Sequence, residues 1–251
     1  MSNSVAHADH GQSHAAHHPA LQHHFDTMAQ QKEAAVVGMW VFLLTEILFF
    51  GGLFVAYMIY RVWYFDAFAE ASRRLSLFWG GLNTAVLIGS SLTMALAVRA
   101  AQTNKRKATV NWLILTMLLG CVFLGVKVIE YEDKFANHEV PGASYDWLYH
   151  ERHAAETGAA HAEPAHELSL TPAQLQNTTQ IYFSLYFTMT GLHALHMIIG
   201  VGLMAVITWM AWKGKFDGEY YTPVEMSGLY WHFVDIVWIF LFPLLYLIDR
   251  S

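Results

Sequence analysis

A few ionisable residues interrupt long apolar stretches of this sequence. Glu46 occurs in FLLTEILFF, His193 and His196 in GLHALHMIIG, and His232 and Asp235 in YWHFVDIVW. Ionisable groups are costly at membrane depth, and they usually face protein rather than lipid. These residues are therefore the candidates for proton chemistry or for polar contacts between helices.

Helical spacing places several candidates on shared faces. Glu225, Gly228, His232 and Asp235 fall at offsets 0, 3, 7 and 10, which is one stripe of one helix. His193, His196 and Gly200 form a similar stripe on the preceding helix. The two stripes carry complementary donors and acceptors, so they predict an interhelical polar network. Structural pairing between helices is the simplest role for such a network.

Two further carboxyl groups need separate interpretations. Lys127 and Glu130, in GVKVIEYED, predict a snorkelling ion pair near the membrane interface. Glu46 has Leu, Ile and Phe neighbours and no basic residue within a helical turn. We expect it to be a protonated carboxyl that is hydrogen-bonded to a neighbouring helix. It can serve as a proton way-station or as a structural contact, and the sequence leaves both roles open.

Catalysis by this chain alone is not expected, and neither is a bound metal. Cys121 is the only cysteine, which excludes intrachain disulfides and thiolate-rich metal sites. No phosphate-binding glycine loop, Ser-His-Asp set or HExxH motif occurs. A haem would have to use His193, His196 or His232, and a copper–haem centre needs more ligands than these three. No basic patch with interleaved aromatic residues suggests a nucleic acid partner.

Five apolar blocks must position these residues. Only 14% of the residues are charged, against about 25% in ordinary soluble domains, and the mean hydropathy is +0.30. The blocks run over 36–60, 77–98, 109–130, 181–212 and 229–248, and crossing a bilayer takes about 20 helical residues. A backbone in lipid must satisfy its own hydrogen bonds. The sequence therefore predicts an all-α, polytopic membrane protein, a bundle of five transmembrane helices within residues 36–251.

Two segments fall outside the blocks. Residues 1–35 form a His-rich flexible tail, with seven histidines within 1–24 and a composition that cannot build a core. Loose metal binding is the alternative interpretation of this tail. Residues 133–177 form an acidic loop. The dense basic run from Arg99 to Lys107 lies in a short loop, which favours a cytoplasmic position for that loop. The amino terminus is then also cytoplasmic, and the acidic loop is external.

Several motifs, in order along the chain, resemble subunit III of the haem-copper terminal oxidases. They are WVFLLTEILFF at 40–50, GGLNTAVLIGSS at 80–91, GVKVIEY at 125–131, GLHALHMIIG at 191–200 and YWHFVDIVWIFLFPLLYL at 230–247. The resemblance covers about 36–248 and is to the five-helix bacterial-type form. The mitochondrial form differs, because two further amino-terminal helices enclose a lipid-filled cleft with the rest of that subunit.

The resemblance implies an accessory subunit of a proton-pumping complex that reduces dioxygen to water. Such a subunit carries no redox centre, stabilises the catalytic subunit and supports proton uptake. The haems and copper then belong to partner subunits I and II, and structural phospholipid is a candidate ligand. Glu46 matches the buried glutamate of the family, which is the target of carbodiimide chemistry. The implied location is a bacterial inner membrane.

The electron donor and two other functions stay open at this point. Cytochrome c oxidases and quinol oxidases share this subunit, and we favour the cytochrome c oxidase, whose donor contacts other chains. One alternative function is a haem b membrane anchor ligated by His193 or His196 together with His232. The other is a proton-coupled transporter that uses Glu46 and Asp235, a class that often shows inverted repeats, which we do not find here.

Overall fold

The structure is a computed structural model that describes residues 19–142, 144–149 and 171–249. Within these ranges lie helices α1 (Met28–Trp63), α2 (Phe65–Arg73), α3 (Leu77–Gln102), α4 (Arg106–Ala136), α6 (Pro172–Trp212) and α7 (Thr222–Tyr246). All except α2 are long and apolar enough to cross a membrane. The predicted all-α class with five membrane-spanning helices is therefore confirmed.

The helices extend beyond the predicted apolar blocks. α1 begins at Met28 because the Thr27 side chain caps it, accepting a hydrogen bond from the backbone N–H of Gln30 at 3.2 Å. α6 begins with a capping box in which Thr171 and Gln174 bond reciprocally. Polar first turns of this kind are invisible to a hydropathy pattern. The predicted loop 133–177 is therefore shorter in the structure, because α4 continues to Ala136 and α6 begins at Pro172.

Parts of the predicted polar segments lie outside the described residues. These parts are residues 1–18 of the His-rich tail and residues 143 and 150–170 of the acidic loop. The predicted boundary of the tail at residue 35 is wrong, because residues 28–35 already belong to α1. Metal binding by the tail stays a prediction.

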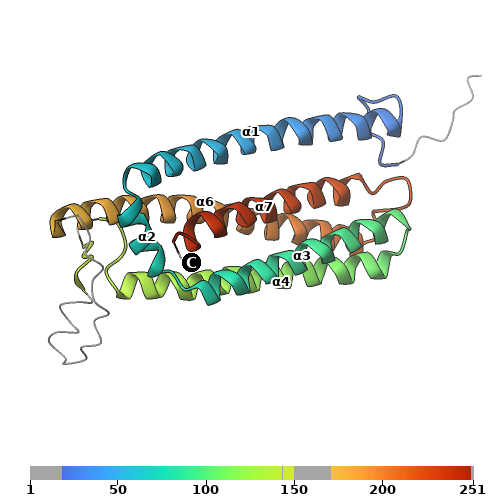
Figure 1. The fold of residues 1–251 in the computed structure, drawn as a ribbon. Helices are drawn as coiled ribbons and strands as arrows, with labels where there is room; N and C mark the ends of the chain where they lie inside the picture. The colour runs from blue at the N-terminus through green and yellow to red at the C-terminus, as the bar shows by residue number, and fades with distance from the viewer. Residues whose placement is uncertain (1–18, 143, 150–170, 250–251) are drawn as a thin grey trace, which may run out of the picture.

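The spanning helices run roughly side by side, and α1 stands somewhat apart from the others (Figure 1). α7 packs against α1, α3 and α6, whereas α4 packs against α3 and α6. α7 is accordingly the most enclosed of the five, and α1 is the least enclosed. The short α2 was not predicted; it turns the chain from the end of α1 back toward α3 and packs against α6.

Trp231 of α7 lies at a tight junction between four helices. The side chain is fully buried, and its indole N–H donates to Ser90 Oγ on α3 at 3.1 Å. A Cβ atom added at Gly120 of α4 would meet the indole at 2.7 Å, and one added at Gly200 of α6 would meet it at 3.1 Å. The absence of a side chain at both positions therefore allows four helices to converge on one ring.

Candidate functional site

Glu46 of α1 pairs with His196 of α6 near the middle of both helices. Glu46 Oε2 lies 3.1 Å from His196 Nε2, and the two side chains are 19% and 14% exposed. The other ring nitrogen, Nδ1, lies 2.7 Å from the backbone oxygen of Leu192. The expected hydrogen bond of Glu46 to a neighbouring helix is thus present, with a histidine as its partner.

The geometry of this pair requires a shared proton. A carbonyl oxygen only accepts hydrogen bonds, so Nδ1 of His196 must carry a proton to bond Leu192. The contact between Nε2 and the Glu46 carboxyl then needs one further proton, which resides on either the acid or the ring. In both arrangements the pair is neutral overall, as suits a site at membrane depth. Such a pair can take up or release a proton only with a change of net charge.

Aromatic groups hold the His196 side of the pair. The Phe50 ring meets the imidazole edge-on at 5.3 Å, and the Tyr230 hydroxyl donates to the backbone oxygen of His196 at 3.0 Å. The two polar stripes predict that His196 faces the final helix, whereas its ring in fact lies against Glu46 and Phe50 of α1. Helical spacing identifies which residues share a face, but it does not identify the helix that this face meets.

Lys127 and Glu130 of α4 form an enclosed ion pair. Lys127 Nζ lies 3.0 Å from Glu130 Oε2, and the two residues are 3% and 4% exposed. Tyr186 of α6 and Tyr246 of α7 each donate a hydrogen bond to Glu130 Oε1 and accept one from Lys127. The predicted snorkelling is therefore wrong, because α6 and α7 enclose the ammonium group.

A second buried cluster continues outward from this pair. Lys134, one turn further along α4, lies 2.8 Å from Glu139 and donates to the backbone oxygen of Arg74 at 2.8 Å. The Arg74 guanidinium also pairs with Glu139 at 3.3 Å and stacks 3.5 Å from the Trp147 ring. This cluster was not predicted from the sequence. The offsets 0, 3 and 7 of Lys127, Glu130 and Lys134 were the available signal for a buried polar stripe.

The segment after α4 folds back over this cluster. Tyr145 is buried there, and its hydroxyl donates to Thr179 Oγ1 of α6 at 2.8 Å. Burial raises the pKa of this phenol above its ordinary value. At least this part of the acidic loop is therefore packed against the helices.

His193 occupies an aromatic site without hydrogen bonds. It is 1% exposed, and its ring contacts Phe123 at 5.4 Å and Trp238 at 5.3 Å. Neither ring nitrogen has a hydrogen-bond partner among the described residues. The predicted direct pairing of the two stripes is consequently absent here, although His193 of α6 does contact α7 through Trp238.

His232 and Asp235 of α7 both face α3. Ser91 Oγ lies 2.8 Å from His232 Nδ1, and the hydroxyls of Ser90 and Ser91 face the Asp235 carboxyl. Asp235 is 2% exposed, yet neither of its oxygens has a well-formed hydrogen bond within the described ranges. These two residues therefore belong to the α3–α7 contact and not to the α6–α7 contact that the stripes suggested.

Glu225 lies apart from the other members of its stripe, at the start of α7. Its carboxylate is 3.0 Å from Lys32 Nζ of α1, and the same ammonium donates to the Tyr221 hydroxyl at 3.0 Å. This ion pair ties the first turns of α1 and α7 together. The five residues of the predicted network thus fall into separate contacts with α1, α3 and α7.

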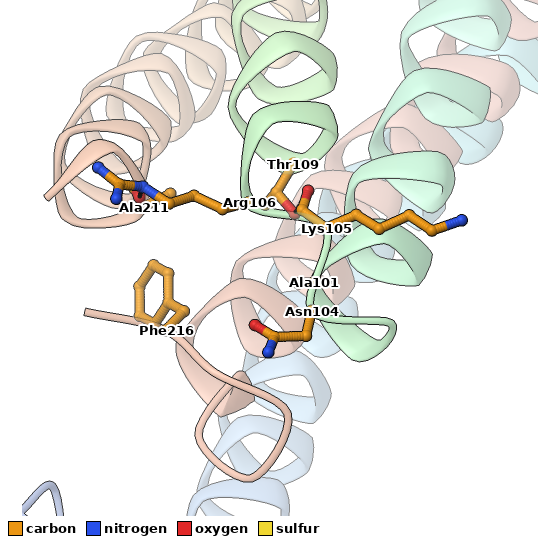
Figure 2. Close-up of a pocket in the computed structure, with 7 residues that line it drawn as sticks. All are labelled: Ala101, Asn104, Lys105, Arg106, Thr109, Ala211 and Phe216. Carbon is orange, nitrogen blue, oxygen red and sulfur yellow. Dashed lines mark hydrogen bonds between the residues drawn. The ribbon is translucent and has the colours of Figure 1, made fainter. Parts of the chain in front are cut away.

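The same end of the molecule carries a small polar hollow between the α3–α4 turn and the end of α6, shown in Figure 2. Arg106 Nε donates to the backbone oxygen of Ala211 at 3.1 Å and so caps α6, whose last carbonyls lack helical partners. The hollow measures about 10 Å³, which is room for one water molecule at most. It is a capping contact and not a ligand site.

No group of three or more His, Cys, Asp or Glu side chains in the described part of the chain could hold a metal ion. The three histidines that a haem could use are instead engaged separately. His196 contacts Glu46, His232 contacts Ser91, and His193 packs against aromatic rings. The arrangement suits proton sharing and helix packing.

Five long apolar helices with polar pairs between them define a polytopic membrane protein. A family model described as cytochrome c oxidase subunit III matches residues 166–249. The chain is 30% identical over 233 residues to cytochrome c oxidase subunit 3 of Corynebacterium diphtheriae, covering 89% of this chain and 96% of that protein. The chain therefore belongs to the subunit III family of the haem-copper oxidases, as the motifs indicated, and is an accessory subunit of a terminal oxidase.

Two further relatives differ in the donor that their names imply. Cytochrome c oxidase subunit 3 of Thermostichus vulcanus is 29% identical over 226 residues, which cover 90% of this chain and 92% of that protein. Cytochrome bo(3) ubiquinol oxidase subunit 3 of Pseudomonas aeruginosa is 26% identical over 212 residues, which cover 84% of each chain. Membership of the family is thus compatible with either electron donor.

Proposed function

We propose that this chain is subunit III of a proton-pumping cytochrome c oxidase that reduces dioxygen to water. It binds the catalytic subunit I, which carries haem and copper, and it assembles with subunit II. It holds no redox centre of its own. The near-complete match to the Corynebacterium diphtheriae protein, 30% identical over 96% of its length, carries this proposal. Cytochrome c reaches the complex through other subunits.

The Glu46–His196 pair supports the second part of the proposal, which is assistance in proton uptake. The pair shares one proton and lies on α1, the helix that is least enclosed by the rest of the chain. A group at the edge of the subunit can exchange protons with a neighbouring subunit, whereas an enclosed group cannot. Glu46 therefore either passes protons toward the catalytic subunit or is a structural contact that stabilises the surface near which protons are taken up.

We also propose that the end with the α3–α4 turn is cytoplasmic in a bacterial inner membrane. Six cations lie in the last turn of α3, in the α3–α4 turn and first turn of α4, and just after α6: Arg99, Lys105, Arg106, Lys107, Lys213 and Lys215. A dense run of Lys and Arg in a short loop is typical of the cytoplasmic side.

Copurification tests the proposal most directly. An affinity tag on this chain, used on native membranes in mild detergent, should recover a haem- and copper-bearing subunit with oxygen-reducing activity. Reduced cytochrome c should support that activity and reduced quinol should not. Activity with quinol alone would assign the chain to a quinol oxidase. A stable isolated chain without a haem-bearing partner would contradict the whole proposal.

The accessory role predicts a specific defect when the chain is removed. The remaining complex should keep its haem spectrum and its initial rate of oxygen reduction. It should then lose activity during turnover faster than the complete complex, because the resemblance implies that this subunit stabilises the catalytic subunit. Loss of the haem spectrum itself would instead indicate a role in building the catalytic subunit.

A further inference from the structure

A polar site opens onto the outside of the bundle between α3 and α7. We define the His232 face as Ile88, Ser91, Leu92, His232, Asp235 and Ile236. They line a groove of about 390 Å³, and His232 also lines a second groove of about 480 Å³ between α1 and α7. The apolar members are exposed, with Leu92 at 62% and Ile236 at 50%. His232 therefore sits on a ridge between two apolar grooves.

The polar atoms of this face lie near the middle of the membrane. His232 comes 10 residues after Thr222 and 14 residues before Tyr246, the two ends of α7. At about 1.5 Å per residue these separations are about 15 and 21 Å. Ser91 is similarly central in α3, 14 residues after Leu77 and 11 before Gln102. The hydrocarbon core is about 30 Å thick, so lipid at this depth offers only acyl chains.

The hydrogen bonds within the face leave one ring nitrogen unsatisfied. Ser91 Oγ lies 2.8 Å from His232 Nδ1, so this ring nitrogen has its partner within the chain. A neutral imidazole has one donor and one acceptor nitrogen, so Nε2 also needs a hydrogen-bond partner in either tautomer. No described residue bonds to it.

An unsatisfied polar atom in hydrocarbon is unfavourable, and polar groups in membranes are usually covered by protein. We propose that the His232 face docks a transmembrane helix of the catalytic subunit, which forms a hydrogen bond with His232 Nε2 at mid-membrane depth. This inference rests on the proposed function, and it names the surface through which the two subunits meet. Apolar side chains of that helix fill the grooves on both sides of His232.

Other occupants fit the face less well. A lipid headgroup lies too far from His232 to reach it, and an acyl chain leaves Nε2 unsatisfied. A second copy of this chain, related by a two-fold axis, would present the same ring nitrogen in the same tautomer, so two donors or two acceptors would meet. A transmembrane segment with an amide or a hydroxyl group satisfies the site, because these groups both donate and accept hydrogen bonds. The His232 face is therefore complementary to a different protein chain.

Photo-crosslinking in the intact complex tests this surface. A benzophenone amino acid replaces Leu92 or Ile236 on the His232 face, and the control replaces Leu118, which is 57% exposed on α4. After copurification has been established, irradiation of native membranes should join the first two positions to the haem-bearing subunit. The Leu118 position should not form this product. Covalent binding only to lipid, or to a second 28.5 kDa copy of this chain, would overturn the inference.

The outcomes separate the inference from the proposed function. If the haem-bearing subunit copurifies but crosslinks from Leu118 and not from Leu92 or Ile236, only the docking surface is wrong. If no haem-bearing subunit copurifies, both are wrong. His232→Phe should lower the amount of chain retained in the complex by about 5-fold, as expected for one lost hydrogen bond. His232→Gln keeps a side chain that can donate and accept hydrogen bonds, so it should retain more than His232→Phe. Equal retention of both variants would contradict the hydrogen bond.

Discussion

The Glu46–His196 and Lys127–Glu130 pairs lie at membrane depth but are built in opposite ways. Lys127 and Glu130 are enclosed by α4, α6 and α7, and two tyrosine hydroxyls satisfy their remaining hydrogen-bonding capacity. Glu46 and His196 share a single contact at 3.1 Å, and both remain partly exposed beside α1. The difference separates a static pair that locks helices together from a pair that can still exchange a proton.

The number of hydrogen bonds explains why one pair is static. Burying an ion pair is favourable only when its geometry is good and its other lone pairs and protons are satisfied. Glu130 accepts from Lys127, Tyr186 and Tyr246, so any change in its charge leaves several partners unsatisfied. Glu46 has only His196 as its partner among the described residues, so a change in its protonation disturbs one contact.

The largest expected effect is at the enclosed pair. Glu130→Gln removes the charge that balances Lys127 and should destabilise the folded chain by about 3–5 kcal/mol. The midpoint of thermal unfolding in mild detergent, together with the yield of assembled complex, measures this loss. A midpoint close to that of the unaltered protein would show that the pair is not static.

A double variant sharpens this test. Lys127→Met combined with Glu130→Leu replaces both charges with apolar groups of similar volume. Such replacement of a whole buried pair is often close to neutral. The double variant should therefore be more stable than Glu130→Gln alone, although the two tyrosine hydroxyls lose their partners. A still larger loss would indicate that the tyrosines, rather than the ion pair, hold the three helices.

The expected effect at Asp235 is intermediate. Asp235→Leu leaves the hydroxyls of Ser90 and Ser91 facing an apolar side chain in place of the carboxyl, and it should cost about 1–3 kcal/mol. Thermal unfolding and the yield of complex report the change, and Asp235→Asn is the matched control because it keeps an acceptor oxygen. Unchanged assembly and stability in Asp235→Leu would mean that this carboxyl does not contribute to the α3–α7 contact.

The smallest effect on stability, but the largest difference in reactivity, is expected at Glu46. Glu46→Gln keeps a hydrogen-bonding group of similar volume, so stability should change by less than about 1 kcal/mol. An apolar carbodiimide attacks protonated carboxyls and partitions into hydrocarbon. It should label Glu46, leave the enclosed Glu130 unlabelled and fail to label Glu46→Gln. Mass spectrometry of the peptides distinguishes the two sites, and equal labelling would abolish the contrast between the pairs.

Labelling establishes accessibility, and turnover establishes the role. If Glu46→Gln slows proton uptake in an assembled oxidase with normal haem content, Glu46 relays protons. If turnover and proton pumping are unchanged while the complex stays intact, Glu46 is a structural contact. We favour the structural outcome, because a subunit without redox centres need not lie on the obligatory proton path.

The sequence predicted the helices better than it predicted their neighbours. Long apolar blocks determine membrane spans almost by themselves, because a backbone in lipid has few alternatives to a helix. The partner of Glu46 is 150 residues away in sequence, and neither helical spacing nor composition states that α1 meets α6. For the same reason, His232 and Asp235 were predicted to contact α6, whereas they contact α3. Lys127 was predicted to snorkel because a lysine near the end of an apolar helix has the same local sequence whether it reaches the interface or is enclosed. Only the surrounding helices distinguish the two.

The junction at Trp231 has a consequence for the order of assembly. α7 is synthesised after α3, α4 and α6, so Ser90, Gly120 and Gly200 are already in the membrane before the indole arrives. Until then these three helices lack the side chain that packs between them. Insertion of α7 therefore completes the packing of the bundle, and membrane proteases should recognise a nascent chain that stalls before residue 231 as incompletely folded.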